Sequence, residues 1–255
     1  MLNKFWKRLD QVELTDCETY LVKVDTFGLD DRGRPEYTSW TKHAEYDFDG
    51  YRETFLDTET GHELEDQYST ITHVLIKPTM LELQNHIHEQ NVEKGWWNEP
   101  RCFSTMTNLF ISENSEALEG DRRNLMDDKL PNYPMRVVEI ADMCIRVFDY
   151  LGSVCNTEFV ENLPQRYYRN EDFQWNLSMC SKQLTDAWFD NECLLAKRAS
   201  YCKPLHHAIA IGFQMIREMG YDPIEIILEK HDFNAVRHDH KLENRTTGKP
   251  GAKAY

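Results

Sequence analysis

Residues 111–120 read ISENSEALEG and residues 138–152 read VEIADMCIRVFDYLG, and these two stretches decide the fold. Apolar residues recur in both at the three- and four-residue spacing of an amphipathic helix. A glycine, Gly120 or Gly152, ends each pattern, and glycine commonly follows a helix. The sequence therefore predicts two consecutive helices whose short connection permits antiparallel packing.

The first of these helices carries two carboxylates on or beside its apolar face. Glu113 lies within the apolar arc and Glu116 lies at its edge. The arc itself consists of Met106, Leu109, Phe110 and Ala117. A carboxylate in an apolar seam is costly unless a cation or a dense set of hydrogen bonds compensates it. Two acids three residues apart also repel each other, and a divalent metal ion removes both penalties.

The second helix carries a pair with the same spacing, Glu139 and Asp142. Helical periodicity places this pair on the polar side, in a stripe with Arg146 and Asp149, where an exposed face would explain it. If the two helices pack antiparallel, all four carboxylates can converge. Such all-oxygen coordination suits Mg²⁺, with Mn²⁺ as a substitute.

Two other metal-dependent classes compete with this interpretation. A di-iron carboxylate bundle uses Glu-x-x-His on its helices, and the one such spacing here, Glu59 to His62, falls in a predicted turn. The HDH run at residues 238–240 suggests an HD-type phosphohydrolase. That chemistry needs further His and Asp ligands on earlier helices, and no such arrangement is visible.

Helical periodicity continues through most of the chain after residue 78. The predicted helices span residues 80–93, 104–120, 133–151, 172–189, 204–219 and 223–237. By contrast, TYLVKVDT (19–26) and STITHVLIK (69–77) have strand composition. We therefore predict a mainly α-helical bundle of the all-alpha NTP pyrophosphatase type, with a small strand-containing N-terminal extension. Residues 1–78 form the extension, and residues 79–255 form the helical domain.

The stretch at about 156–204 interrupts the helical domain as an insertion or a degenerate repeat. Aligning Gly152 with Gly220 puts His207 opposite Glu139 and Ala210 opposite Asp142. A second copy of the helix pair would therefore have lost its metal ligands. An unrelated helical insertion explains the same segment.

Composition limits the partners. The formal net charge of -15 argues against nucleic acid, because phosphates would be repelled. No run of about 18 apolar residues is present, which argues against a membrane partner, and the charged first 16 residues do not resemble a signal peptide. Seven cysteines without a CxxC pair fit a reducing, cytoplasmic location.

Four segments in order resemble the MazG-like, all-alpha NTP pyrophosphohydrolases. Glu113-Asn-Ser-Glu116 with Glu139-Ile-Ala-Asp142 resembles the ExxE…ExxD signature of that family. NVEKGWW (91–97) resembles the segment between its first two helices, and EKHDFNAVR (229–237) resembles its K…[YF]N..R ending. The resemblance covers residues 80–155 and 205–255.

The resemblance implies hydrolysis of an NTP or dNTP to the monophosphate and pyrophosphate, in nucleotide-pool control. It also implies a metal site of Glu113, Glu116, Glu139 and Asp142, with Glu113 or Glu116 activating water. The expected substrate contacts are Asn85, His86, Asn91, Lys94, Trp96, Trp97, Lys230, Asn234, Arg237 and Lys241. Family bundles assemble as homo-oligomers, dimers or tetramers.

Two alternatives use the same fold. One is a catalytically silent nucleotide-binding or regulatory protein, which the full set of four acids disfavours. The other is a hydrolase of a different phosphoanhydride, such as an alarmone, which substrate profiling would separate from the first reading. The sequence leaves the base and sugar preference open.

Overall fold

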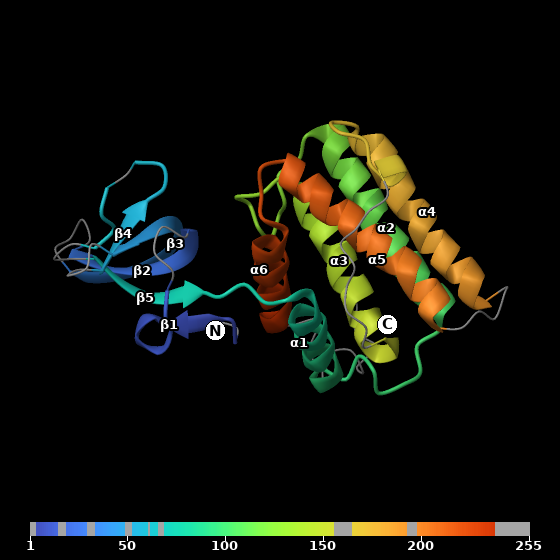
Figure 1. Ribbon diagram of the computed structural model, residues 1–255, viewed down its shortest axis with the longest axis horizontal. Coiled ribbons are helices and arrows are strands. Elements are labelled where there is room, and N and C mark those ends of the chain that lie inside the picture. Colours follow the sequence, from blue (N-terminus) through green and yellow to red (C-terminus); the bar gives the residue numbers. More distant parts are fainter. Residues whose placement is uncertain are drawn as a thin grey trace. The chain divides into compact units, whose positions relative to one another are not determined.

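The computed structural model describes residues 4–14, 19–29, 34–48, 53–60, 62–65, 69–155, 165–192 and 198–237. The chain forms two compact units, residues 1–77 and residues 78–255. The first unit contains the strands and the second contains the long helices (Figure 1).

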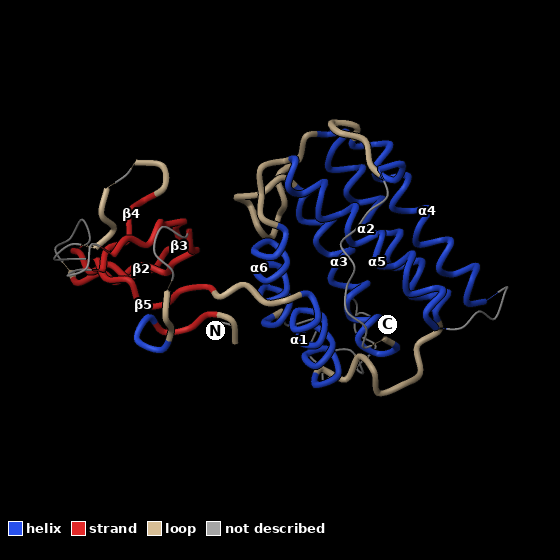
Figure 2. Tube along the Cα trace, viewed as in Figure 1, coloured by secondary structure: helices blue, strands red, loops and turns tan. Residues whose placement is uncertain are grey.

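The N-terminal unit is an antiparallel sheet of five strands in the order β1-β5-β2-β3-β4. Figure 2 shows its strands in red. The strands are β1 (Trp6–Arg8), β2 (Thr19–Leu29), β3 (Pro35–Phe48), β4 (Glu53–Asp57) and β5 (Ser69–Leu75), with the 3-10 turn η1 (Leu9–Gln11) after β1. Alternate side chains of the strands form one buried cluster: Val22, Val24, Ala44, Tyr46, Phe55, Ile71 and Val74. This alternation is typical of a sheet with one buried face and one exposed face.

The prediction of a mainly α-helical fold is therefore wrong, because the chain is a mixed α and β protein. The extension is a complete sheet, and its longest strand, β3, was missed. The sequence of β3, PEYTSWTKHAEYDF, is largely polar because many of its side chains are exposed. Its pairing with β2 along eleven residue positions, rather than its own hydrophobicity, makes it a strand.

The C-terminal unit contains six α-helices within its described residues. They are α1 (Met80–Glu93), α2 (Phe103–Arg123), α3 (Met135–Val154), α4 (Phe173–Glu192), α5 (Arg198–Glu218) and α6 (Pro223–Val236), with the short 3-10 turn η2 (Gln165–Tyr167) before α4. Helices α2, α3, α4 and α5 pack side by side, and α1 and α6 both contact α3 (Figure 1). Helix α3 is consequently buried along most of its length.

Local sequence signals fix the ends of the outer helices. Thr79 and Glu82 form a capping box at the start of α1. Asp222 accepts hydrogen bonds from two backbone N–H groups at the start of α6, where Pro223 occupies the first helical position.

No helix among the described residues is long and apolar enough to cross a membrane.

Helices α4 and α5 pack against each other as α2 and α3 do. The predicted alignment pairs Cys144 of α3 with Gly212 of α5, and a Cβ at Gly212 would meet the Cys144 Sγ atom at 3.0 Å. Helices α3 and α5 therefore approach each other closely at this pair of positions. At the place corresponding to the Glu113–Glu139 region, His207 Nδ1 lies 3.3 Å from Gln183 Oε1.

Candidate metal and phosphate site

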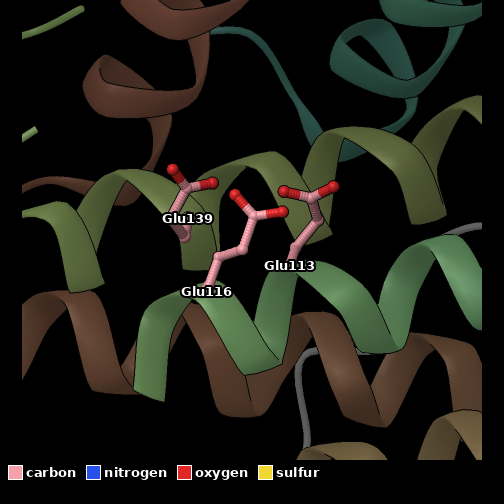
Figure 3. Close-up of side chains that lie close together, drawn as sticks. All are labelled: Glu113, Glu116 and Glu139. Carbon is pink, nitrogen blue, oxygen red and sulfur yellow. The ribbon is translucent and has the colours of Figure 1, made fainter. Parts of the chain in front are cut away.

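Three of the four predicted carboxylates meet between α2 and α3. Glu113, Glu116 and Glu139 each place one oxygen within 4.8 Å of the others (Figure 3). Glu113 and Glu139 are buried, and Glu116 is exposed. The cluster thus extends from the helix interface to solvent.

The connection between α2 and α3 brings the acids together. Helix α2 ends at Asn124, which adopts a left-handed conformation with φ 49°, as asparagine tolerates well. Asp127 then accepts hydrogen bonds from the backbone N–H groups of Lys129 and Leu130 and closes a tight turn. The two helices can therefore run antiparallel and face each other over their full length.

The electrostatics of the cluster are unfavourable without a cation. Burial raises the pKa of Glu139 to about 8, and the neighbouring carboxylate of Asp142 adds to the effect, while Lys230 opposes it. Burial also raises the pKa of Glu113, although the Arg146 guanidinium opposes this shift. Desolvation and like charges thus disfavour the ionised state of two adjacent acids.

Asp142, the fourth predicted ligand, lies apart from the close triad and is bound by two groups of α6. Its Oδ2 atom lies 3.2 Å from Lys230 Nζ, and its Oδ1 atom accepts a 3.1 Å hydrogen bond from Asn234 Nδ2. Lys230 is itself buried. Burial alone would lower the pKa of its ammonium group, but Asp142 and Glu139 outweigh burial and the pKa is raised. Helix α6 is therefore linked to the acidic cluster by charge.

The three clustered carboxylates suit a hard divalent ion. They offer only oxygen atoms, which Mg²⁺ and Mn²⁺ prefer over softer ligands. Their buried members carry repulsion that a cation would relieve, and Glu116 has open access to solvent. Glu113, Glu116 and Glu139 would hold the ion, and Asp142 is close enough to Glu139 to act on its charge.

A cavity of about 490 Å³ opens beside these acids. Its walls contain five of the predicted substrate-binding residues, Asn91, Lys94, Trp96, Asn234 and Arg237. Three of these interact with one another: Lys94 Nζ donates to the Asn234 carbonyl oxygen at 3.2 Å, and Arg237 Nη1 donates to Asn234 Oδ1 at 3.4 Å. Part of the cavity lining is therefore cationic, and Asn234, which also donates to Asp142, connects it to the carboxylates.

The other predicted substrate contacts lie elsewhere. Asn85 borders a separate cavity of about 290 Å³, and Lys230 contacts Asp142. The ring of His86 packs at 5.2 Å against His231. Trp97 donates its indole N–H to Asp149 at 2.8 Å. Lys241 and the HDH run lie outside the described residues.

The predicted polar stripe of α3 is wrong in two of its members. Glu139 and Asp149 are both buried, because α1, α2 and α6 cover this side of the helix. Arg146 was assigned no role, but its Nε atom lies 2.7 Å from Glu113 Oε1 and it lines the cavity. Its position four residues after Asp142 was the available signal for that role.

Three further titratable residues of the cavity lining were not predicted to belong to the site: Arg101, Asp149 and His231. Neither ring nitrogen of His231 has a hydrogen-bond partner among the described residues. Burial lowers its pKa to about 3, with His86 and Lys94 adding to the effect. The imidazole is therefore neutral at physiological pH, and no pattern in the sequence distinguished it from a core residue.

Comparison with protein-family models, with curated proteins and with solved structures finds no match to this chain.

Proposed function

We propose that this protein is a Mg²⁺-dependent hydrolase that cuts a nucleoside triphosphate into a monophosphate and pyrophosphate. The main support is the cavity beside Glu113, Glu116 and Glu139, which combines clustered acids, cationic groups and the ring of Trp96 in one lining. Carboxylates without cations would repel a polyphosphate, and cations without carboxylates would not hold a divalent ion. The resemblance of the ExxE and ExxD segments to MazG-like enzymes points to the same chemistry.

Each part of the cavity has a distinct task in this proposal. A bound Mg²⁺ would neutralise the phosphate oxygens and polarise the phosphorus that water attacks. Lys94 and Arg237, which line the same cavity, bind the remaining phosphate charge. Trp96 offers a ring face to the nucleoside.

Glu116 is the best candidate to orient and deprotonate the attacking water. Glu113 is bound by Arg146 at 2.7 Å, and Glu139 is buried among other acids. Glu116 is exposed at the edge of the cavity, and no hydrogen bond or ion pair holds it among the described residues. A carboxylate at the solvent side that is not fully committed to the metal ion can accept a proton and release it to bulk water.

A panel of ribo- and deoxyribonucleoside triphosphates with Mg²⁺, scored separately for pyrophosphate and orthophosphate, tests the proposal. We expect equimolar monophosphate and pyrophosphate, without orthophosphate. The panel should include a guanosine tetraphosphate as a representative alarmone. Orthophosphate as the first product would contradict the proposal and indicate cleavage at a different phosphate. Turnover of the alarmone alone would contradict it and indicate a different substrate.

A further inference from the structure

We propose that Asp149 reads the base of the nucleotide by accepting a hydrogen bond from an N–H group on its Watson–Crick edge. The inference rests on the proposed function and identifies what the far end of the same cavity recognises. It requires that Asp149 is held rigidly, that one of its oxygens can still accept a hydrogen bond, and that it lies at a nucleoside's length from the acids.

Asp149 is held in place through one of its two oxygens. Its side chain is buried, and Oδ1 accepts hydrogen bonds from His88 Nδ1 at 2.9 Å and from Trp97 Nε1 at 2.8 Å. His88 lies on α1, where it packs against Gly152, and a Cβ at Gly152 would meet the His88 Cβ at 2.4 Å. The close approach of α1 to α3 thus holds His88 in place, and His88 in turn holds the Asp149 carboxylate.

The second oxygen of Asp149 keeps its capacity to accept. Among the described residues its one recorded neighbour of opposite charge is Arg101, whose Nη1 atom lies 3.8 Å from Oδ2, beyond hydrogen-bonding distance. Arg101 also lies over the rings of Trp96 and Trp97, at 5.9 and 5.5 Å from their centres. Asp149, Arg101 and Trp96 all line the cavity. A carboxylate oxygen with unused acceptor capacity, on a buried side chain that lines a cavity, favours a ligand that donates to it.

The position of Asp149 matches the length of a nucleoside. It lies seven residues after Asp142 on α3, which corresponds to about 10 Å along a helix axis. Helix α2 runs in the opposite direction, so Met106 and Leu109 line the cavity beyond Glu113, towards the same end. One end of the cavity therefore carries metal-type ligands. The other carries apolar side chains, the ring of Trp96, the Arg101 guanidinium and the Asp149 acceptor.

Each of the common nucleobases presents at least one N–H on its Watson–Crick edge, whereas inorganic polyphosphates present none. A carboxylate fixed at that edge strengthens the binding of a base that donates a hydrogen bond to it. It weakens the binding of a substrate that leaves it without a donor. Asp149 would therefore give this site its requirement for a nucleoside.

A chemical double-mutant cycle tests the role of Asp149. The substrate is the triphosphate that the full-length wild-type protein hydrolyses best, and its partner is the same nucleotide with each Watson–Crick N–H replaced by N-methyl. We expect methylation to lower kcat/KM about 10- to 100-fold in the wild type. In Asp149→Ala, the unmodified nucleotide should lose a similar factor, and methylation should have little further effect.

The controls separate hydrogen bonding from folding and bulk. Asp149→Asn keeps an oxygen that can accept hydrogen bonds from His88 and Trp97, so the fold should be retained. This variant tests whether the negative charge of Asp149 contributes to turnover. Asp186→Ala removes a partly exposed acid on α4, and its methylation penalty should equal that of the wild type. Equal turnover of the parent and methylated nucleotides by the wild type would overturn the inference, as would an undiminished penalty in Asp149→Ala.

The inference and the proposed function fail in distinguishable ways. Wild-type hydrolysis that ignores base methylation refutes only the role of Asp149. If no triphosphate releases pyrophosphate, the proposed reaction fails. The wild type and Asp149→Ala are then compared by calorimetric binding of a non-hydrolysable triphosphate and of its N-methylated counterpart. Affinity that depends on both the N–H and Asp149 would still support base reading, and affinity that depends on neither would refute it.

Discussion

Replacing Glu116 with glutamine is expected to lower pyrophosphate release at least about 100-fold while leaving the fold intact. The amide keeps the shape of the side chain but cannot take a proton from water and coordinates a cation weakly. Because Glu116 is exposed, its replacement leaves no buried group unpaired. The measurement is kcat with the best triphosphate, together with circular dichroism to verify folding.

Glu119→Gln is the matched control for that variant. Glu119 lies three residues further along α2, where it pairs with Arg123 at 2.9 Å and does not line the cavity. It should retain wild-type turnover. Full activity in Glu116→Gln would remove this carboxylate from the mechanism.

Replacing Glu139 with glutamine is expected to stabilise the metal-free protein, although it removes a proposed metal ligand. Burial and the Asp142 carboxylate raise the pKa of Glu139 to about 8, above its ordinary value of 4.5. The folded state therefore binds more protons than the unfolded state between these values, and stability falls as pH rises through this range. Glutamine resembles the protonated acid, so the variant should be more stable at pH 8 by on the order of 2 kcal/mol.

Thermal unfolding in the presence of a chelator measures this effect across pH 4.5 to 8. The wild-type midpoint should fall over the range, and the midpoint of Glu139→Gln should fall less. Added Mg²⁺ with a non-hydrolysable triphosphate should raise the wild-type midpoint and act only weakly on the variant. A metal-free variant less stable than the wild type at pH 8 would contradict this account of the cluster.

Helix positions were predictable where local signals decided them. The predicted starts of α1 and α6 are confirmed, because Thr79 and Asp222 cap these starts through contacts within a few residues. The predicted ends of both helices agree to within one residue. Helix α5 was less predictable. It begins at Arg198, six residues before Pro204, and continues through that proline, which was expected to start it. Packing against α4 outweighs the local preference of proline here.

The sheet was underestimated for a related reason. Strand β3 has few apolar residues, and its place between β2 and β4 depends on partners distant in sequence. The strand regions of β2 and β5 were recognised because both carry a buried apolar face. A strand whose side chains are mostly exposed gives little signal in its own sequence.

The candidate site was likewise predictable only in part. The two acidic pairs were visible from their spacing on α2 and α3, and three of those carboxylates come together. The link between Asp142 and Lys230, and the link from His88 and Trp97 to Asp149, depend on how α6 and α1 dock on α3. Periodicity within one helix does not specify such contacts, so the buried role of Asp149 was not predicted.

Calorimetric titration of the metal-free, full-length protein with Mn²⁺ at pH 8 tests the central claim most directly. The account predicts saturable binding to the wild type, equal binding to Glu119→Gln, and at least about tenfold weaker binding to Glu113→Gln and Glu139→Gln. Binding of equal affinity in the wild type and in these two carboxylate variants would contradict it, as would a folded wild-type protein that binds no Mn²⁺.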